Sequence, residues 1–376
     1  MGSARIANKV KKCKMGKENR PILPESGNKM NFKKVMLVFS LIIIVAAVIV
    51  LGVSISPKKD VNEDKIRVTV SNFASYDFLR AIIGETDNIE LVFLLGPGKD
   101  THSYELTAQD LITIQNSDVF VYIGENVENW SSKVLESMDL NNTKVLCIAE
   151  DIVVSNDKGA EESAHLESAD GAIAEEANDE HKEDEHVEDL HAGHNHELDA
   201  FDEHIWTSPE NAIIMIKALE KMISEIDAEN ASAYRENAES YIKQIEAVDG
   251  KIKEIIDNKV RDRLVFGDKM PMQYFIEYYD LEVSAAFTGC STEAEPSASI
   301  IAHLVDTVRA EAIPVVLFIE MGNEKVANTI VNEVGNGCVA MQIQTLHNVS
   351  KEDFESGQTW VSLMERNLDV LRKALQ

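Results

Sequence analysis

The alternation of short apolar runs with amphipathic helical segments is the feature that most limits how this chain can fold. Lys65–Val70 has the pattern of a strand, Ser71–Gly84 has apolar residues at helical spacing, and Ile89–Leu95 is a second strand-like run. Parallel neighbouring strands need a long crossover, usually a helix, between them. The order therefore predicts an α/β fold with mostly parallel sheets flanked by helices.

The same alternation occurs in two blocks of the chain. The first block continues with a helix over Thr107–Asn116, for which Thr107 is a good N-cap, and with strands over Val119–Ile123 and Lys144–Ile148. The second block predicts strands and helices in turn, over Arg263–Phe266, Pro271–Tyr279, Ser284–Phe287, Ser297–Ala310, Val315–Ile319, Glu324–Val334, Val339–Thr345 and Trp360–Leu375.

A long helical stretch separates the two blocks. It begins at Pro209, after Ser208 as N-cap, and runs to about Asn258 with a break near Asp227–Asn230. We therefore expect two lobes, over residues 65–225 and 259–376, joined by one long backbone helix over residues 226–258.

Residues 151–203 interrupt the first block with an acidic, histidine-rich insertion. Residues 157–203 hold 18 acidic residues against 2 lysines, and few large apolar side chains. This composition predicts a disordered insertion. Six of the ten histidines lie here, namely His165, His181, His186, His191, His194 and His196. The HxxHxH spacing of the last three favours loose metal contact, and the alternative is a solvated acidic linker.

Residues 36–53 (MLVFSLIIIVAAVIVLGV) form an uncharged apolar run close to the length of about 20 residues that crosses a bilayer. Lysines in the basic segment 1–35 place that segment in the cytoplasm and the rest of the chain outside, by the positive-inside rule. An uncleaved anchor followed by a linker over residues 54–64 is favoured. A cleaved signal peptide is the alternative, and Met30 could be the true start. No cysteine follows the run, so lipid anchoring is not supported.

Charge and cysteine content exclude two broad classes of function. The formal net charge of −29 would repel a phosphate backbone, which argues against nucleic-acid binding. The four cysteines form no CxxC pair, so a thiolate zinc finger is not expected. A disulfide between Cys290 and Cys338 and a pair of buried free thiols both remain open.

Polar residues at strand ends are the candidate site. His102 lies between a strand and a helix, His204 just before the long helix, and His347 just after the last strand. Asp268 and Glu320 end two further strands, and open α/β sheets bind ligands at such ends. Imidazole with one or two carboxylates suits zinc, and manganese less well. His303, inside a helix, is expected to be a packing or surface residue.

Several stretches resemble the zinc/manganese substrate-binding proteins of ABC transporters, the cluster A-I group, from about Lys65 to the C-terminus. GPGKDTHSYELT is similar to that family's PGxDPHxYEPT, and DEHIWTSPENA to its DPHxWLDPxNA. YIGENVENW, NASAYRENAESYIKQI and AAFTGCSTEAEPS also match. The resemblance implies two α/β lobes, a rigid backbone helix and a metal held between the lobes. The long His- and acid-rich insertion is typical of the zinc-specific members.

The resemblance also implies ligand positions. His102 and His204 match the first two ligands of the family, both from the first lobe. The third is a His or Glu five residues before a Tyr, and counting back from Tyr274 gives Lys269, which cannot bind a metal while protonated. This departure from the pattern leaves the neighbouring Asp268 as the candidate.

The fourth ligand of the family is usually an Asp after the last strand, and that position falls on or near His347. A Glu like Glu320 coordinates zinc in some members. The resemblance therefore implies a site of His102, His204, His347 and Asp268, with Glu320 as the alternative carboxylate.

The function implied is capture of zinc and delivery to the permease of an ABC importer, by a monomer without enzymatic activity. A manganese-binding member is the nearest alternative. A zinc hydrolase would need a general base, for which Glu293 or Glu295 could serve, but no HExxH motif is present. A metal-buffering or adhesion protein remains open. Because metal binding requires neutral imidazoles, affinity is expected to fall steeply below about pH 6.

Overall fold

The computed structural model describes residues 65–124, 128, 130–150, 204–287 and 296–376. The predicted anchor at 36–53, the linker at 54–64, the insertion at 151–203 and Cys290 lie outside these residues, and the expectations about them stay predictions. Among the helices of the described ranges, none combines the length and the apolar character needed to cross a bilayer.

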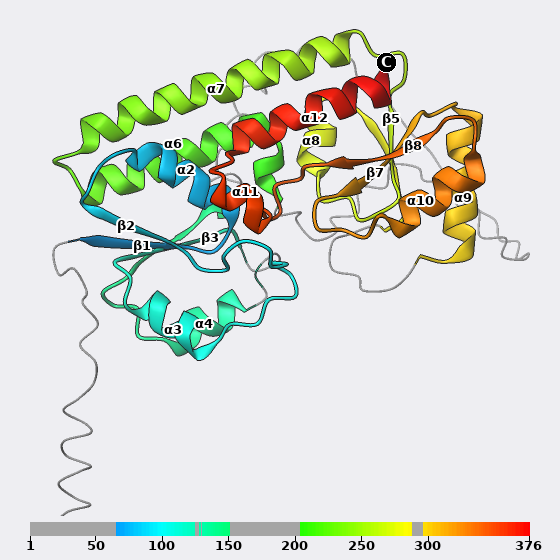
Figure 1. The fold of residues 1–376 in the computed structure, drawn as a ribbon. Coiled ribbons are helices and arrows are strands. Elements are labelled where there is room, and N and C mark those ends of the chain that lie inside the picture. The colour runs from blue at the N-terminus through cyan, green and yellow to red at the C-terminus, as the bar shows by residue number, and fades with distance from the viewer. Residues whose placement is uncertain (1–64, 125–127, 129, 151–203, 288–295) are drawn as a thin grey trace, which may run out of the picture. The chain divides into compact units, whose positions relative to one another are not determined.

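The first sheet has four parallel strands in the order β2-β1-β3-β4 (Figure 1). Its strands are β1 (Ile66–Val70), β2 (Ile89–Phe93), β3 (Val119–Tyr122) and β4 (Lys144–Cys147). The helices in this part of the chain are α2 (Phe73–Ile83), α3 (Ala108–Gln115) and α4 (Ser131–Ser137). The predicted N-cap of α3 is present, because the Thr107 hydroxyl accepts a hydrogen bond from the backbone N–H of Asp110.

The second sheet repeats this topology in the order β6-β5-β7-β8, again with all pairs parallel. Its strands are β5 (Arg263–Phe266), β6 (Glu282–Ala285), β7 (Val315–Ile319) and β8 (Val339–Ile343). The helices that follow these strands are α8 (Gln273–Tyr278), α9 (Ala298–Ala310), α10 (Glu324–Val334), α11 (Lys351–Glu355) and α12 (Trp360–Leu375). The predicted fold class, two α/β lobes with parallel sheets, is confirmed.

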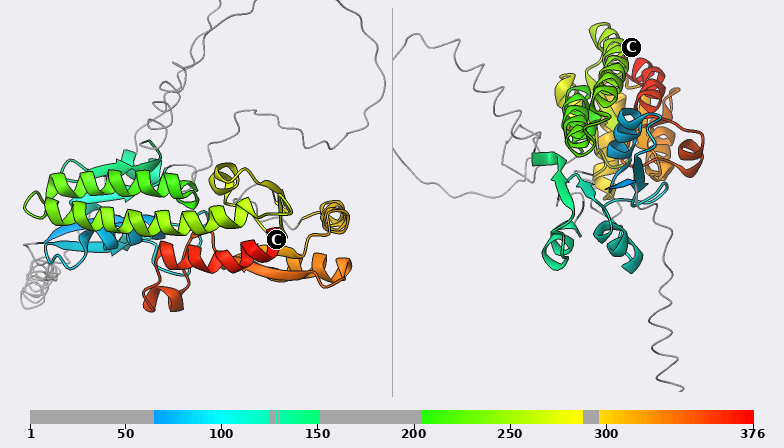
Figure 2. Two further views of the ribbon diagram at one scale, coloured as in Figure 1. Left: turned by 90° about the horizontal axis from the view of Figure 1, so that it is seen from above. Right: turned by 90° about the vertical axis from the view of Figure 1, so that its left-hand side faces the viewer.

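Two long helices connect the sheets, α6 (Pro209–Ile226) and α7 (Ala231–Asp257). The predicted break between them is present, and the Asp227 carboxylate fixes the turn by accepting hydrogen bonds from Tyr234 Oη at 2.7 Å and Asn230 Nδ2 at 2.8 Å. Helix α7 packs against α6, α2 and α12, and α6 and α7 lie side by side (Figure 2). The expected backbone helix is therefore α7.

One apolar core continues through both lobes. Val121 of β3 and Phe266 of β5 belong to the same cluster as buried residues of α2, α6, α7 and α12. The alternate residues Phe120 and Val265 face two separate, smaller cores on the opposite faces of their sheets. Residues from 64 to 376 form one contact unit, which agrees with this shared core.

The strand order places a switch point in each sheet. Strand β1 has β2 on one side and β3 on the other, and β5 is likewise flanked by β6 and β7. Open α/β sheets bind ligands outside the carboxyl ends of their strands at such points. The loops after β2, β5, β7 and β8 carry His102, Asp268, Glu320 and His347.

Candidate metal centre

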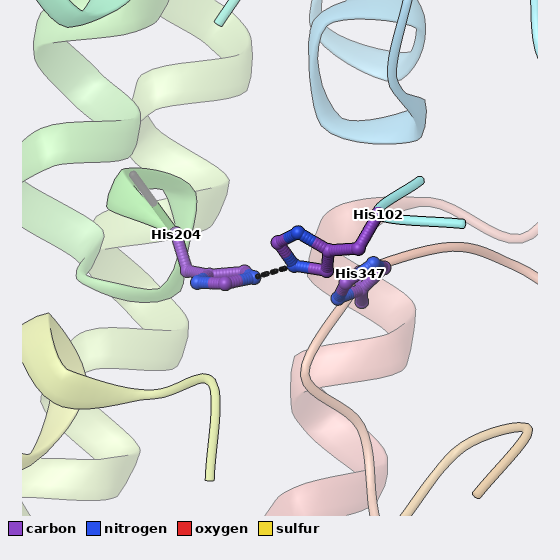
Figure 3. A group of neighbouring side chains, drawn as sticks. All are labelled: His102, His204 and His347. Carbon is purple, nitrogen blue, oxygen red and sulfur yellow. Dashed lines mark hydrogen bonds between the residues drawn. The ribbon is translucent and has the colours of Figure 1, made fainter. Parts of the chain in front are cut away.

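Three histidines from separate segments meet in one cluster (Figure 3). His102, His204 and His347 each offer one ring nitrogen, and these atoms all lie within 4.8 Å of one another. The ring centroids are 5.2 Å apart for His102 and His204, 4.9 Å for His102 and His347, and 5.2 Å for His204 and His347. Within the described residues, this is the group of His, Cys, Asp and Glu side chains that could hold a metal ion.

The His102 loop is shaped by an Asx turn and by glycines. The Asp100 carboxylate accepts a hydrogen bond from the backbone N–H of His102 at 2.9 Å. Gly96 and Gly98 have φ values of 69° and 78°, a region that glycine enters without steric cost. The backbone N–H of Gly98 donates to the Val349 carbonyl at 2.9 Å, which connects this loop to the segment after β8.

His204 comes directly before a short 3-10 turn, η1 (Ile205–Thr207), that leads into α6. The Thr207 hydroxyl donates to the His204 carbonyl at 2.8 Å. The Trp206 ring lies edge-on to the His204 ring with centroids 5.3 Å apart. Both side chains are buried, so the His204 imidazole is held against an apolar wall.

His347 is positioned by its backbone. The preceding residue, Leu346, has a φ of 59°, an uncommon value for a residue with a branched side chain. The Glu320 carboxylate accepts from the backbone N–H of His347 at 3.0 Å and from that of Thr345 at 2.7 Å. These contacts hold the loop in the conformation that brings His347 to the other two histidines.

The surroundings of His102 and His347 favour the neutral forms of these two imidazoles. Burial lowers the pKa of His102 to about 3, and the neighbouring His347 and His204 contribute in the same direction. Burial also lowers the pKa of His347, although Asp100, whose Oδ1 lies 3.5 Å from His347 Nε2, opposes this shift. The hydrogen bond from His347 in turn holds the pKa of Asp100 well below its usual range. Neutral imidazoles offer the lone pairs that a metal requires.

The predicted carboxylate ligands are not part of the cluster. Asp268 accepts from the backbone N–H groups of Lys269 at 2.8 Å and Ile319 at 3.2 Å, and a Cβ on Gly322 would approach its Oδ2 to 2.1 Å. Burial raises the pKa of Asp268. Asp268 therefore braces the carboxyl ends of β5 and β7.

Glu320 is likewise occupied by the Thr345–His347 loop, and burial raises its pKa to about 7. Neither carboxylate offers an atom to the group of ligand atoms that lie within 4.8 Å of one another. Both assignments remain predictions, and the three histidines are the part of the predicted set that the structure brings together.

Asp100 belongs to the surroundings of the cluster, whereas His303 does not. Asp100, which contacts both His102 and His347, was not among the predicted site residues, although its place two residues before His102 is the spacing of an Asx turn. His303 lies exposed on α9, so of the two predicted roles, packing or surface, it has the surface one.

The cluster has the spacing of a transition-metal site. His102 Nε2 and His204 Nε2 are 3.1 Å apart. Tetrahedral zinc with Zn–N bonds of about 2.0–2.1 Å would place its nitrogen ligands roughly 3.3 Å apart. Small rotations of the rings would therefore accommodate an ion.

The chain is similar in sequence to known zinc-binding and zinc-uptake proteins. The chain is 29% identical over 311 residues to the zinc-binding lipoprotein AdcA of Streptococcus pneumoniae, and the match covers 83% of this chain and 56% of that protein. It is 28% identical over 316 residues to the high-affinity zinc uptake system protein ZnuA of Bacillus subtilis, covering 84% of this chain and 89% of that one. The chain thus spans little more than half the length of the pneumococcal relative.

Solved structures give the same result for the fold. The Zn(II)-bound ZnuA-like domain of Streptococcus pneumoniae AdcA superposes with a TM-score of 0.61 at 26% identity, covering 83% of this chain and 99% of that domain. The family model described as zinc-uptake complex component A, periplasmic, matches residues 68–374. Because that match includes both sheets and all three clustered histidines, the chain belongs to the ZnuA family of zinc-uptake component A proteins.

Proposed function

We propose that this chain is an extracytoplasmic solute-binding protein that captures zinc and delivers it to the permease of an ABC importer. The observation that carries the proposal is the cluster of His102, His204 and His347, whose ligand atoms lie within 4.8 Å of one another. Two of these residues come from the part of the chain that precedes α6, and His347 follows the last strand of the second sheet. An ion bound there would bridge the two lobes.

Three imidazoles favour zinc over manganese. Imidazole is a borderline-soft ligand that suits zinc, whereas manganese prefers carboxylate and water oxygens. Neither Asp268 nor Glu320 joins the cluster, so the described site offers no carboxylate-rich shell. The names of the pneumococcal and Bacillus relatives also refer to zinc. Water or a carboxylate would complete the coordination.

Capture without catalysis is part of the proposal. The ligands would come from both lobes, residues 65–225 and 259–376, with residues 226–258 as the linking helix. The buried contacts of α7 with α2, α6 and α12 would restrict opening to a small tilt. We further propose that residues 36–53 tether a monomer to the outer face of the cell membrane near its permease.

Metal titration of the purified full chain, kept in mild detergent, tests this function. We expect one tight equivalent of zinc, and manganese bound much more weakly. Tight manganese binding with little preference for zinc would instead assign the protein to manganese uptake. If neither metal bound tightly, the likeness to zinc-uptake proteins would describe the fold alone.

Delivery needs a test in cells. Deletion of the gene should slow growth under zinc chelation and reduce zinc accumulation, in a strain without a second zinc-binding protein. Unchanged zinc accumulation would contradict delivery to an importer and favour a buffering role.

A further inference from the structure

We propose that Trp206 and Glu320 are positioning residues that hold the peptide of Thr345 from opposite lobes and thereby fix His204 and His347 relative to each other. This inference rests on the proposed zinc site and adds to it two residues that lie outside the three-histidine cluster. The contacts involve the N–H, the hydroxyl and the carbonyl of a single buried threonine.

Glu320, from the second lobe, forms hydrogen bonds with Thr345. Its Oε2 accepts from the backbone N–H of Thr345 at 2.7 Å, and its Oε1 accepts from the Thr345 hydroxyl at 2.8 Å. The same Oε1 accepts from the backbone N–H of His347 at 3.0 Å. Glu320 directly follows β7, so these three bonds fasten the His347 loop to the end of a central strand.

Trp206, two residues after His204, forms a hydrogen bond with the same Thr345. Its indole N–H donates to the Thr345 carbonyl at 3.0 Å, and Trp206 is 1% exposed. The Trp206 carbonyl accepts from the indole N–H of Trp360 at 2.8 Å. The backbone N–H of Trp360 donates to Asp77 of α2 at 2.7 Å. Trp206 is therefore held by α12, whose first residue is in turn bonded to α2.

The His102 loop is fastened to the same segment. Asn348 Nδ2 donates to the Gly96 carbonyl at 3.2 Å, and the backbone N–H of Gly98 donates to the Val349 carbonyl at 2.9 Å. Residues 345–349, here called the junction segment, thus contact the loops of all three histidines. Their hydrogen bonds make the junction segment the element that sets the spacing of the cluster.

Loss of the hydrogen bonds with either Trp206 or Glu320 leaves a buried polar group of Thr345 without its partner. Thr345 is fully buried, and an unpaired buried donor or acceptor is costly. The segment would shift to regain a partner, and His347 would move with it. A site functions only when its ligands are held to within about 0.5 Å, so a small shift of the peptide would weaken metal binding.

Four single variants and one double variant of the full chain test the inference. Trp206→Phe removes the indole donor and retains an aromatic ring, and Glu320→Gln removes a carboxylate that serves three donors. Trp130→Phe is the control for Trp206→Phe, because it makes the same change outside the cluster, directly before α4. Asp227→Asn is the control for Glu320→Gln, because Asp227 also accepts from three donors, at the turn between α6 and α7. Zinc affinity, the visible spectrum of bound Co²⁺ and unfolding of the metal-free protein are measured for each.

We expect Trp206→Phe and Glu320→Gln each to weaken zinc binding by about 10–100-fold, the usual cost of losing an outer-shell partner. Both should also shift the Co²⁺ bands, whereas the controls should match the unaltered protein in both readouts. Both residues act through one peptide, and the effects of residues that share a partner are not additive. The double variant should therefore bind zinc at most about threefold more weakly than the single variant with the lower zinc affinity.

Unchanged affinity and Co²⁺ spectra in both single variants, or multiplied effects in the double variant, would overturn the inference. If Glu320→Gln fails to fold, Thr345→Val replaces it, because this change removes the hydroxyl donor to Glu320 and leaves the peptide. Absence of tight zinc binding by the unaltered chain would instead reject the proposed function, so the two failures are distinguishable.

Discussion

His102 is the residue on which the proposed metal site depends most, since its Nε2 lies 3.1 Å from His204 Nε2 and its ring centroid 4.9 Å from that of His347. His102→Ala should weaken zinc binding by more than about 100-fold, because even outer-shell changes cost about 10–100-fold. Competition with a chromophoric chelator measures this. The exposed His303→Ala is the control and should bind normally. A His102→Ala protein within threefold of the unaltered chain would remove His102 from the site.

Protons should compete with zinc less than the histidine content suggests. Three ordinary imidazoles with a pKa of about 6.5 would lose roughly 600-fold in affinity between pH 7 and 5.5. The pKa of His102 is lowered to about 3, so this ring stays neutral over the whole range, and burial lowers the pKa of His347 as well. The expected loss is therefore at least about eightfold smaller than that value, because His102 takes no part in it. Titrations at both pH values measure it, and a loss near 600-fold would contradict it.

Residue patterns in the sequence located the histidines and left the carboxylates undecided. Each of the three histidines stands beside a strand or helix end that local pattern identifies, so their meeting follows from the parallel topology. The roles of Asp268 and Glu320 depend on partners 51 and 25 positions away, namely the N–H of Ile319 and that of Thr345. Local sequence carries no signal for such contacts.

At the scale of helices and strands, Asp77 joins three helices at one buried point. This carboxylate of α2 accepts from Tyr241 Oη of α7 at 2.5 Å and from the backbone N–H of Trp360 of α12 at 2.7 Å. Asp77→Asn should lower the free energy of unfolding by about 1–3 kcal/mol, because Arg80 loses its carboxylate acceptor and the buried hydrogen bonds from Tyr241 and Trp360 lose their charge-assisted strength. Urea denaturation of the metal-free protein measures this change.

A matched control for Asp77 lies on α12. Asp369→Asn removes an exposed ion pair with Arg372 and should change stability by less than about 1 kcal/mol. Equal stability of the Asp77 and Asp369 variants would show that the three-helix contact adds nothing to the folded state.

Elements with strong local signals were predicted well, and elements with weak local signals were not. Helices α10 and α12 and strands β5 and β7 have the predicted bounds, since apolar periodicity and caps define them. Strand β6, predicted over Ser284–Phe287, lies over Glu282–Ala285, because its register is set by pairing with β5. The short helices α4 and α11 were not predicted, since few residues carry their pattern and tertiary contacts decide them.

The apolar core that both sheets share explains why the two lobes form one compact unit. Apolar residues of both sheets pack on α7 and α12, so the lobes cannot separate without exposing that core. The sequence predicted two blocks and a linking helix, but periodicity alone does not reveal that one apolar cluster spans both. That arrangement depends on which helix faces meet, and only the folded chain determines it.

The folded lobes and the acidic insertion should bind zinc with different strength. Deleting residues 157–200 removes six histidines but none of the clustered three, which come from the lobes. The tight zinc equivalent should survive with its affinity changed by less than about threefold, because each clustered histidine is positioned by contacts among residues outside the insertion. Any weaker equivalents should disappear, since the closely spaced histidines of the insertion, a tract rich in histidine and acidic residues, are expected to bind metal loosely. Isothermal titration of both forms separates the two classes. If the deletion abolished the tight equivalent while the lobes stayed folded by circular dichroism, the insertion would hold the zinc, and the three-histidine cluster would not be the capture site.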